Sequence, residues 1–512
     1  MDLGFVDIAF FLLFFVIVVG ISMWKSRARK SGEDFFLAGR SLMWPMIGLS
    51  LIAANISTEQ IVGQAGQGAS NVGLAVASYE WMAAITLVIV AFLFLPRFLR
   101  IGIYTMPEYL EHRYNSTSRA LMAIYTMIIY VGVTISSVIY SGALTINTIF
   151  DINLVTATWV IGGIAALYTI WGGLKAVAWA DLFLGGALIL GGIVVLIIGL
   201  NEVGGLGSFL AANEDRMHMI LPADHPVLPW TALVVGLWIP NFYYWGMNQY
   251  ITQRTLAAQS LRQGQLGILF AAGLKLVIPF IVIFPGIIAY QLYSSELAGT
   301  PDAAYPLLIR NLIPAGVRGF IFAAIAGAVI SSLASMLNSA STIFTMDLYQ
   351  RHMKKDASST QLVGMGRIMT LILVVIGCFI APQLNNPAFK GIYNYIQEFQ
   401  GFVSPGILAA FVFGVASKKS PPAAGVVALV AGPVIYGILY FAAGDIAFLN
   451  RMAITFGIIL VLMTLVTIIK PLPEPKKMPE REGFTDIKLR KDILIGGLTV
   501  IALTLVLYVI FW

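Results

Sequence analysis

The chain has 512 residues, of which 59% are hydrophobic and only 11% are charged, and its formal net charge is +6. Apolar runs of about 20 residues, the length that one bilayer crossing requires, recur from end to end. This composition excludes a soluble globular protein and predicts a polytopic, all-α membrane protein.

Fourteen transmembrane helices are predicted, and each span takes the chain to the opposite side of the membrane. The loops after the odd-numbered spans hold 25 of the 31 Lys and Arg residues, the other loops hold 5, and Lys275 lies inside a span. Because positive charge concentrates on the cytoplasmic side, we expect both termini outside the cell (inner) membrane. The predicted spans are 4–24, 41–69, 74–96, 120–148, 155–171, 179–201, 229–253, 265–293, 316–346, 366–384, 391–416, 421–444, 450–469 and 493–512.

The basic surplus is therefore a topology signal next to the lipid bilayer, and no nucleic acid partner is expected. The first span follows Asp2 and Asp7 and precedes "KSRARK", the reverse of a secretory signal peptide, so we expect it to stay as an anchor. The sequence has one cysteine, four scattered histidines, and no P-loop, HExxH or GxSxG pattern. We expect no enzymatic activity and no zinc or haem site.

Two spans contain polar interruptions. The second includes "SLIAANISTEQIVGQAG" (50–66), and the seventh includes "GLWIPNFYYWGMNQY" (236–250), where Pro240 and Gly246 bracket aromatic and amide residues. Pro removes a backbone donor and Gly weakens a helix, so we expect unwinding there. Interrupted spans at corresponding positions are typical of a transporter site. Their offset of five spans makes two five-helix units run in opposite directions, as an inverted repeat.

An ionisable side chain inside a membrane span costs free energy, so its presence suggests a functional role. Glu59, Glu80, Asp181 and Glu398 are the carboxylates, and Lys275 is the embedded cation. The alternative interpretation is a structural ion pair or a side chain that reaches the membrane interface.

A third segment, "AAIAGAVISSLASMLNSAST" (323–342), places Ala328, Ser331 and Ser332 on one helix face. On its own, the segment favours a packing seam of small residues over a sodium site.

The combination of "SLIAANISTEQ", "ASYEWM", "YYWGMNQYITQRTLAA", "SSLASMLNS" and "YIQEFQGFVSPGI" resembles the solute:sodium symporter family, in particular its bacterial sodium/galactose (sodium/glucose) cotransporter branch. The resemblance runs from the first span to the last. It implies a leucine-transporter-type inverted repeat (5+5) with one extra N-terminal and three extra C-terminal helices. The implied regions are 1–40 (extra helix and basic loop), 41–203 (first repeat), 204–228 (extracellular loop), 229–416 (second repeat) and 417–512 (accessory helices with a charged loop).

The resemblance also implies a sodium site. Its ligands would be the backbone carbonyls of Ala53, Ile56 and Ala328 and the hydroxyls of Ser331 and Ser332, five oxygens without a formal charge, which suit Na⁺ as the co-transported ion. Asp181 resembles an acid close to this site and would assist sodium entry or coupling. A second sodium site is put in doubt because Ala334 precedes Ser335, so we expect one sodium per cycle.

By the same resemblance, a sugar pocket would use Gln60, Glu80, Asn241, Lys275 and Gln397, with Tyr244 stacking on the ring. Amides, a carboxylate and an ammonium together satisfy sugar hydroxyls, and an aromatic face covers the C–H side of the ring. Glu80 and Lys275 cancel in charge, which favours a neutral substrate. The expected supporting and gate residues are Asn55 and Asn248, which would hold Tyr244 or the unwound backbone, Tyr79 and Tyr393 in the outer lid, and Trp245 beside the inner gate.

Two departures bear on the sugar. Ala83 replaces a serine of galactose-transporting relatives, and Gln64 replaces an apolar outer-gate residue. The resulting hypothesis is a sodium-coupled symporter that imports a neutral monosaccharide of the galactose or glucose type by alternating access. Sodium symport of another polyol such as myo-inositol, or of a different small solute, stays open, as does a channel or sensor on the same scaffold. The first and last spans are candidate contacts for a homodimer.

Overall fold

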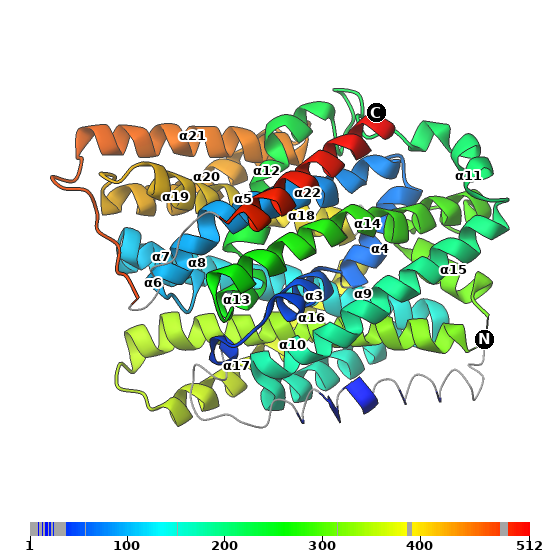
Figure 1. Cartoon of the computed structure of the whole chain (residues 1–512), viewed down its shortest axis with the longest axis horizontal. Helices are drawn as coiled ribbons and strands as arrows, with labels where there is room; N and C mark the ends of the chain where they lie inside the picture. The colour runs from blue at the N-terminus through cyan, green and yellow to red at the C-terminus, as the bar shows by residue number, and fades with distance from the viewer. Residues whose placement is uncertain are drawn as a thin grey trace.

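The computed structural model describes residues 37–512 except 57, 151, 315, 387–391 and 482–489, together with isolated positions among the first 36. Within helices, the side chains of 58–59, 148–150, 171–173 and 175–176 are not described either. Most of the predicted first span and the Glu59 side chain therefore lie outside the described residues. The described residues form helices and loops without a strand, apart from one isolated bridge between Leu42 and Ala258 (Figure 1). This confirms the all-helical fold class.

The elements up to residue 228, including those in the long loop at 203–228, comprise several short 3₁₀ or π-helical stretches between longer α-helices. They are η1 (Ala38–Arg40), α3 (Trp44–Asn55), α4 (Thr58–Ala69), η2 (Gly73–Ala77), α5 (Ser78–Ile89), η3 (Val90–Phe94), α6 (Leu95–Ile101), α7 (Met106–Arg113), α8 (Ser116–Ile129), η4 (Tyr130–Ile135), α9 (Ser136–Phe150), α10 (Leu154–Glu202), α11 (Leu206–Ala212) and η5 (Glu214–Arg216).

The second part of the chain alternates in the same way. Its elements are η6 (Ala232–Gly236), α12 (Trp238–Phe242), η7 (Tyr243–Met247), α13 (Gln249–Leu256), α14 (Leu261–Tyr293), η8 (Pro301–Ala303), α15 (Ala304–Leu312), α16 (Val317–Ile343), η9 (Phe344–Met353), α17 (Ser359–Ile380), η10 (Ala381–Asn385), α18 (Ile392–Gln400), α19 (Ser404–Ala416), α20 (Pro422–Ala442), α21 (Phe448–Ile469) and α22 (Lys491–Ile510).

In the described part of the chain, nine helices are long and apolar enough to cross a membrane, or up to 11 if each of two bent pairs forms one span. These correspond to all the predicted spans except the first, fifth and seventh. Most of the first lies outside the described residues, the fifth contains the shorter apolar helix Leu154–Ile170, and the seventh is divided into pieces. The total of fourteen stays a prediction.

The prediction of a loop between the fifth and sixth spans is wrong, because helix α10 continues through residues 172–178. That segment, "GGLKAVA", has no proline, and Leu, Lys and Ala are good helix formers, so the connection keeps helical hydrogen bonding. A straight helix of 49 residues would be about 74 Å long, more than twice the roughly 30 Å of the hydrocarbon layer. The two apolar parts of α10 therefore still correspond to two crossings.

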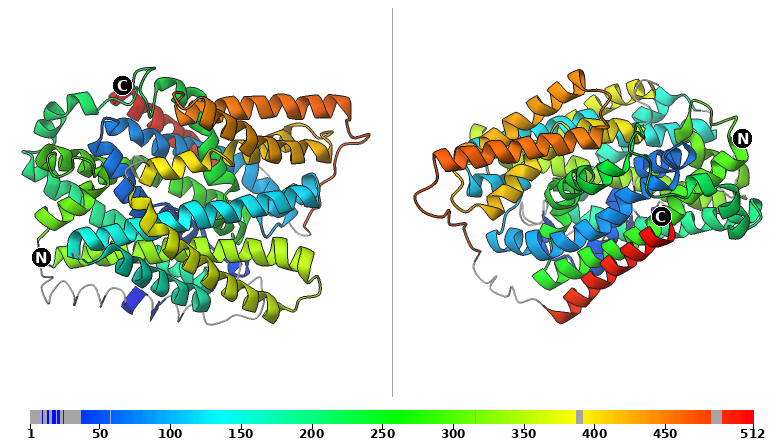
Figure 2. Two further views of the ribbon diagram at one scale, coloured as in Figure 1. Left: turned by 180° about the vertical axis from the view of Figure 1, so that it is seen from behind. Right: turned by 90° about the horizontal axis from the view of Figure 1, so that it is seen from above.

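Helix α16 lies in the middle of the molecule, and 89% of the most apolar 18-residue stretch of its span is buried. It packs against α10, which also contacts α3, while α14 packs against α3, α4 and α5. By contrast, only 22% of the corresponding stretch is buried in α21 and in α22. These two helices lie at the edge of the bundle (Figures 1 and 2). Their exposed apolar side chains are those expected of helices that face lipid.

The loops gather at two ends of the bundle. At one end the C-terminal end of α22 lies beside the long loop, where the Met219 amide donates to the Phe511 carbonyl at 2.9 Å. At the other end Arg481 N donates to Arg100 O at 2.7 Å, and Lys476 N donates to Lys418 O at 2.9 Å. Loops that follow the third, eleventh and thirteenth predicted spans thus meet, as alternating crossings require.

The second span is broken as predicted, since α3 and α4 meet at a bend of 56°. The seventh span breaks later than predicted. Pro240 stays inside α12, near its start, where the first amides of a helix lack partners anyway. The extended residue is Asn248, with φ −78° and ψ 125°. A third break, of 47° between α18 and α19, interrupts the predicted continuous span 391–416.

Candidate binding site at the broken helices

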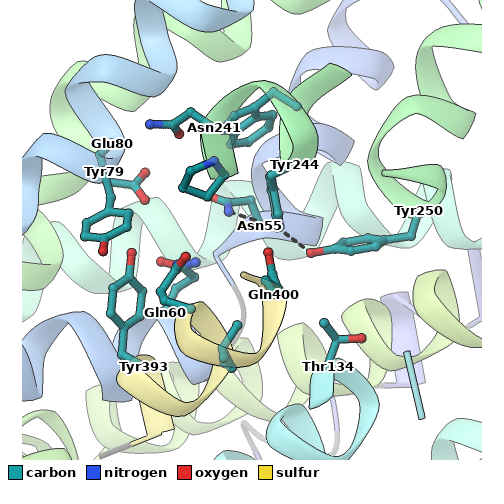
Figure 3. Close-up of a pocket in the computed structure, with 14 residues that line it drawn as sticks. Asn55, Gln60, Tyr79, Glu80, Thr134, Asn241, Tyr244, Tyr250, Tyr393 and Gln400 are labelled. Carbon is teal, nitrogen blue, oxygen red and sulfur yellow. Dashed lines mark hydrogen bonds between the residues drawn. The ribbon is translucent and has the colours of Figure 1, made fainter. Parts of the chain in front are cut away.

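A central pocket lies where the three broken segments meet (Figure 3). Its lining comes from α3 and α4, from α5, from α12 and η7, and from α18, with two further residues from η4 and α13. The lining residues are Asn55, Gln60, Tyr79, Glu80, Thr134, Pro240, Asn241, Tyr244, Trp245, Tyr250, Tyr393, Ile396, Gln397 and Gln400. The fold thus brings together most of the residues predicted for a sugar site and its gates.

The pocket is small in this structure. Its volume of about 40 Å³ is room for roughly three water molecules at 10–15 Å³ each. Ligand pockets usually have volumes of about 300–1,000 Å³. The arrangement is therefore a contracted one, and a sugar would enter only after the surrounding segments move apart.

Tyr79 and Tyr393 close one side of the pocket. Their rings lie edge to face, with centroids 5.1 Å apart and planes at 88°, and Figure 3 shows the two side chains pointing toward each other. Both are buried. They come from α5 and α18, so separation of these two helices would open this side.

Tyr244 lies on another side, in a chain of polar contacts. Asn55 Nδ2 donates to the Tyr244 hydroxyl at 3.0 Å, and the Tyr250 hydroxyl donates to the same oxygen (Figure 3). Asn55 ends α3 and Tyr244 belongs to η7. The bond therefore joins the two broken helices, as was expected of Asn55.

Asn248 makes a different contact. Its Oδ1 accepts from the Tyr130 hydroxyl, and the same hydroxyl oxygen accepts from the backbone amide of Tyr250 at 2.9 Å. Through this contact Asn248 helps to fix the unwound backbone. The sequence had given no signal for Tyr130, which lies at the start of a π-helical stretch of an ordinary apolar span.

Four amide side chains leave polar atoms without partners at the pocket. Within the described residues, Gln60 Oε1, Asn241 Nδ2, Gln397 Oε1 and Gln400 Oε1 are buried atoms that make no hydrogen bond. Each belongs to a residue that lines the pocket. Buried polar groups normally have partners, so a cluster of unpaired amides around one cavity favours a ligand rich in hydroxyl groups.

Gln400 had not been predicted. It is three residues after Gln397 on α18, so helical geometry places the two amides on one face. That spacing was the signal that would have identified it.

Lys275 lies behind the pocket and is not one of its lining residues. Its Nζ donates to Glu80 Oε2 and to Asn55 Oδ1, and it lies 4.7 Å from the centre of the Trp245 ring. Lys275 is fully buried, and so is almost all of the Glu80 side chain. The pair therefore gives the pocket wall no net charge.

Gln64 contacts both this pair and the predicted outer gate, since its side chain also hydrogen-bonds Tyr393. Its Nε2 donates to Glu80 Oε1 at 2.7 Å, so both carboxylate oxygens of Glu80 have partners. Ala83 is buried and does not line the pocket.

The residues predicted for sodium lie at the end of α3 and in the middle of α16. Ala53, Ile56, Ala328, Ser331 and Ser332 are all buried. The Ser332 hydroxyl donates to the Ala53 carbonyl at 3.4 Å, which joins the two halves of the predicted site. Helix α16 runs through Ala328 without an interruption.

Asp181 on α10 reaches this same region. Its Oδ1 accepts from the Ser331 hydroxyl, and its Oδ2 accepts from the Ser50 hydroxyl. The predicted closeness of Asp181 to the candidate sodium ligands is therefore present in the structure.

The partner of Asp181 is Arg254, which the sequence had placed in a cytoplasmic loop. That placement is wrong, because Arg254 is fully buried in α13. Its Nη2 lies 2.9 Å from Asp181 Oδ2, its Nε donates to the Ser50 hydroxyl at 2.6 Å, and Nη2 also donates to Ser335. The ion pair with the distant Asp181 offsets part of the cost of burying the guanidinium, and no local sequence pattern predicts it.

A sequence model of the family described as "Sodium:solute symporter family" matches residues 35–432. The sodium/glucose cotransporter of Vibrio parahaemolyticus is 40% identical over 542 aligned positions, which cover 100% of this chain and 99% of that protein. The uncharacterized symporter YidK of Escherichia coli is 36% identical, covering 96% and 88%. Sodium/glucose cotransporter 1 of Mus musculus is 32% identical, covering 81% and 68%.

Two solved structures share the fold. A Na⁺-coupled sialic acid symporter superposes with a TM-score of 0.82 at 21% identity, covering 93% of this chain and 100% of that one. The nucleobase-cation-symport transporter Mhp1 superposes with a TM-score of 0.56 at 13% identity, covering 87% and 97%. At such identities the likeness concerns the arrangement of helices alone.

Proposed function

The chain belongs to the sodium:solute symporter family, and on that premise we propose that it imports a neutral monosaccharide of the galactose or glucose type together with sodium. It is a multi-pass membrane protein. We assign it transport and no enzymatic reaction, and we place it in the cell membrane with both termini outside. We also propose that residues 41–203 and 229–416 form the two inverted repeats.

The unpaired amides carry the proposal for the substrate. Gln60, Asn241, Gln397 and Gln400 present both acceptor oxygens and a donor to one cavity. A sugar hydroxyl donates and accepts at once, so this set matches a polyol. Tyr244 lines the same cavity and offers an aromatic face to the C–H side of a ring.

The charge of the pocket favours a neutral substrate. Glu80 is the one ionisable carboxylate or cation among the described lining residues, and Lys275 compensates it from behind. An anionic substrate would need a free cation in the wall. Another polyol such as myo-inositol would satisfy the same amides, and it is therefore the second candidate.

For sodium, we propose the carbonyls of Ala53, Ile56 and Ala328 with the hydroxyls of Ser331 and Ser332. The Ser332–Ala53 contact supports the pairing of these two helices. All the proposed ligand atoms are uncharged oxygens, which suit a monovalent cation.

Asp181 and Arg254 would couple the site to the cycle. In this structure the Ser331 hydroxyl is bonded to Asp181, so sodium would take that hydroxyl from the carboxylate. The Ser335 hydroxyl contacts Arg254 and the Ser331 carbonyl, which leaves it unsuited to a second sodium and supports a stoichiometry of one. The coupling between sodium and sugar would be about 1–3 kcal/mol.

Alternating access would use the three breaks. Sodium between α3 and α16 would hold an arrangement in which α5 and α18 are apart and Tyr79 no longer contacts Tyr393. Sugar would then close that side, and loss of sodium would release Tyr244 from the Asn55 contact. A continuous channel is disfavoured, because aromatic side chains close the pocket on both sides.

The test is uptake of labelled galactose by proteoliposomes under an inward sodium gradient, with potassium as the control ion. Gln397→Ala and Ser332→Ala should each abolish or strongly reduce accumulation. The matched controls are Gln383→Ala and Thr464→Ala, which remove an exposed amide and an exposed hydroxyl. Uptake of glucose or inositol without galactose would keep the symporter and change the sugar, whereas no sodium-driven uptake of any polyol would refute the proposed substrate class.

A further inference from the structure

Helix α21 is one of the accessory C-terminal helices, yet its first turn touches two of the broken segments. Leu449, Asn450 and Arg451 follow one another at the start of α21. They contact η6, which leads into α12 and η7, and α18. The seventh span and α18 carry Asn241 and Gln397, which both line the central pocket.

Arg451 binds Glu398, an embedded carboxylate to which no role has yet been assigned. Arg451 Nη2 lies 2.9 Å from both Glu398 Oε1 and Oε2. The Arg451 side chain is 6% exposed and that of Glu398 is 22% exposed. A largely buried, charge-assisted contact of this kind restricts both partners more than a surface pair does.

Helix α20 also packs against the end of α18. The Tyr436 hydroxyl donates to Glu398 Oε1 at 2.7 Å, and the Arg451 guanidinium lies 5.7 Å from the centre of the Tyr436 ring. Gly401, directly after α18, would place a Cβ only 2.3 Å from that ring. The end of α18 therefore sits against α20 at a distance that admits no side chain.

The other contact is with the seventh span. Asn450 Nδ2 donates to Thr231 Oγ1 at 2.9 Å, one residue before η6 begins. A Cβ at Gly236, the last residue of η6, would lie 2.5 Å from the Leu449 carbonyl oxygen. The backbones of η6 and α21 are thus in direct contact, and η6 cannot move closer to α21.

We propose that the first turn of α21 is a positioning bridge, which fixes the separation of Asn241 from Gln397 and thereby sets the affinity for the sugar. The proposal rests on the sugar-binding function proposed for this pocket. Because Gln397 directly precedes Glu398, a turn of α18 about its axis would move both side chains together. Arg451 would act through Glu398 and would not touch the sugar.

The bridge predicts an effect on sugar but not on sodium. The proposed sodium residues come from α3, α10 and α16, whereas α21 packs against α19, α20, η6 and α12. Arg451→Met should raise the KM for labelled galactose about tenfold in proteoliposomes. Sodium-dependent thermal stabilisation of the purified protein should stay unchanged, and Arg451→Lys should restore part of the lost affinity.

Non-additivity tests the bridge itself. Asn450→Ala alone should raise the KM several-fold, but in the Arg451→Met background it should raise the KM much less. Once the contact with Glu398 is lost, the contact with Thr231 no longer fixes the position of α18 relative to the seventh span. Arg262→Met is the matched control, since it removes an arginine from an exposed ion pair with Asp492, 3.0 Å long. It should leave both KM and sodium stabilisation unchanged.

Hydrogen exchange gives a readout that needs no substrate. In Arg451→Met, amides of α18 and of η6–α12 should exchange faster, while those of α3 and α16 should not. Faster exchange in both segments would support the bridge even if wild-type protein transported no galactose. An unchanged galactose KM in a folded Arg451→Met protein, equal loss of sodium stabilisation, or faster exchange confined to α21 would overturn it.

Discussion

The pH dependence of stability should reveal a buried carboxyl group beside the Tyr79–Tyr393 contact. Asp302 lies in η8, outside the membrane-spanning segments, and is 8% exposed. Its Oδ2 accepts from the Ile392 amide at 3.0 Å, and Ile392 directly precedes Tyr393. Burial raises the Asp302 pKa to about 6, against a smaller opposing effect of the Ile392 hydrogen bond.

The size of the effect follows from the two pKa values. The ordinary pKa of this carboxyl is 3.8 and that in the folded protein is about 6; at about 1.4 kcal/mol per unit, ionisation of folded Asp302 costs about 3 kcal/mol. Between these values the folded protein binds the proton and the unfolded chain does not, so stability falls as pH rises. The loss begins near pH 4 and is complete a little above pH 6.

The substitution to examine is Asp302→Asn, which keeps an oxygen for the Ile392 amide but cannot ionise. In chemical unfolding in detergent, the free energy of unfolding of the variant should rise by about 3 kcal/mol relative to that of the wild type between pH 4 and pH 7. Above pH 7 the difference should stay constant. Asp445→Asn, at an exposed position, controls for the exchange of carboxyl for amide. A difference between Asp302→Asn and wild type that is the same at pH 4.5 and pH 7.5, or that shrinks as pH rises, would refute the reasoning.

Three further predictions concern the binding sites. Gln400→Ala should raise the galactose KM about two- to tenfold, the loss of one hydrogen bond, without changing the sodium concentration for half-maximal uptake; an unaltered KM would place Gln400 outside the sugar contacts. Lys275→Met should lower the free energy of unfolding by about 3–5 kcal/mol, because it leaves Glu80 buried without its cation. Adding Glu80→Gln to this variant should recover part of the lost stability. A double variant less stable than Lys275→Met would contradict this prediction. Ser332→Ala should raise the sodium concentration for half-maximal uptake while the sugar KM at saturating sodium stays near the wild-type value, and a change in the sugar KM alone would count against a sodium ligand.

Hydropathy and charge predicted most of the spans because the bilayer leaves few choices of length and composition. The break in the second span was predictable for the same reason. A polar run from Asn55 to Gln64 in an apolar segment needs partners inside the protein, and Glu80 and Tyr244 provide two of them.

Long-range pairing was not predictable in this way. Arg254 follows an apolar segment, as a cytoplasmic arginine would, and its partner Asp181 is 73 residues away. The break after Gln400 was missed because a single Gly401 and the nearby Pro405 are common in membrane helices. At this bend Gly401 packs closely against the Tyr436 ring, a contact between distant segments that the local sequence does not reveal.

The contraction of the central pocket separates the overall affinity of the transporter for sugars from its preference among them. If a sugar binds only the fraction of molecules in which the pocket is wide, the apparent dissociation constant is the intrinsic one divided by that fraction. A population of about 1% would weaken every sugar about a hundredfold. If the Tyr79–Tyr393 contact sets that fraction, as proposed, it would scale the affinities of all sugars alike. The proposed sugar-binding amides of α4, α12 and α18 would then set the ratios between those affinities.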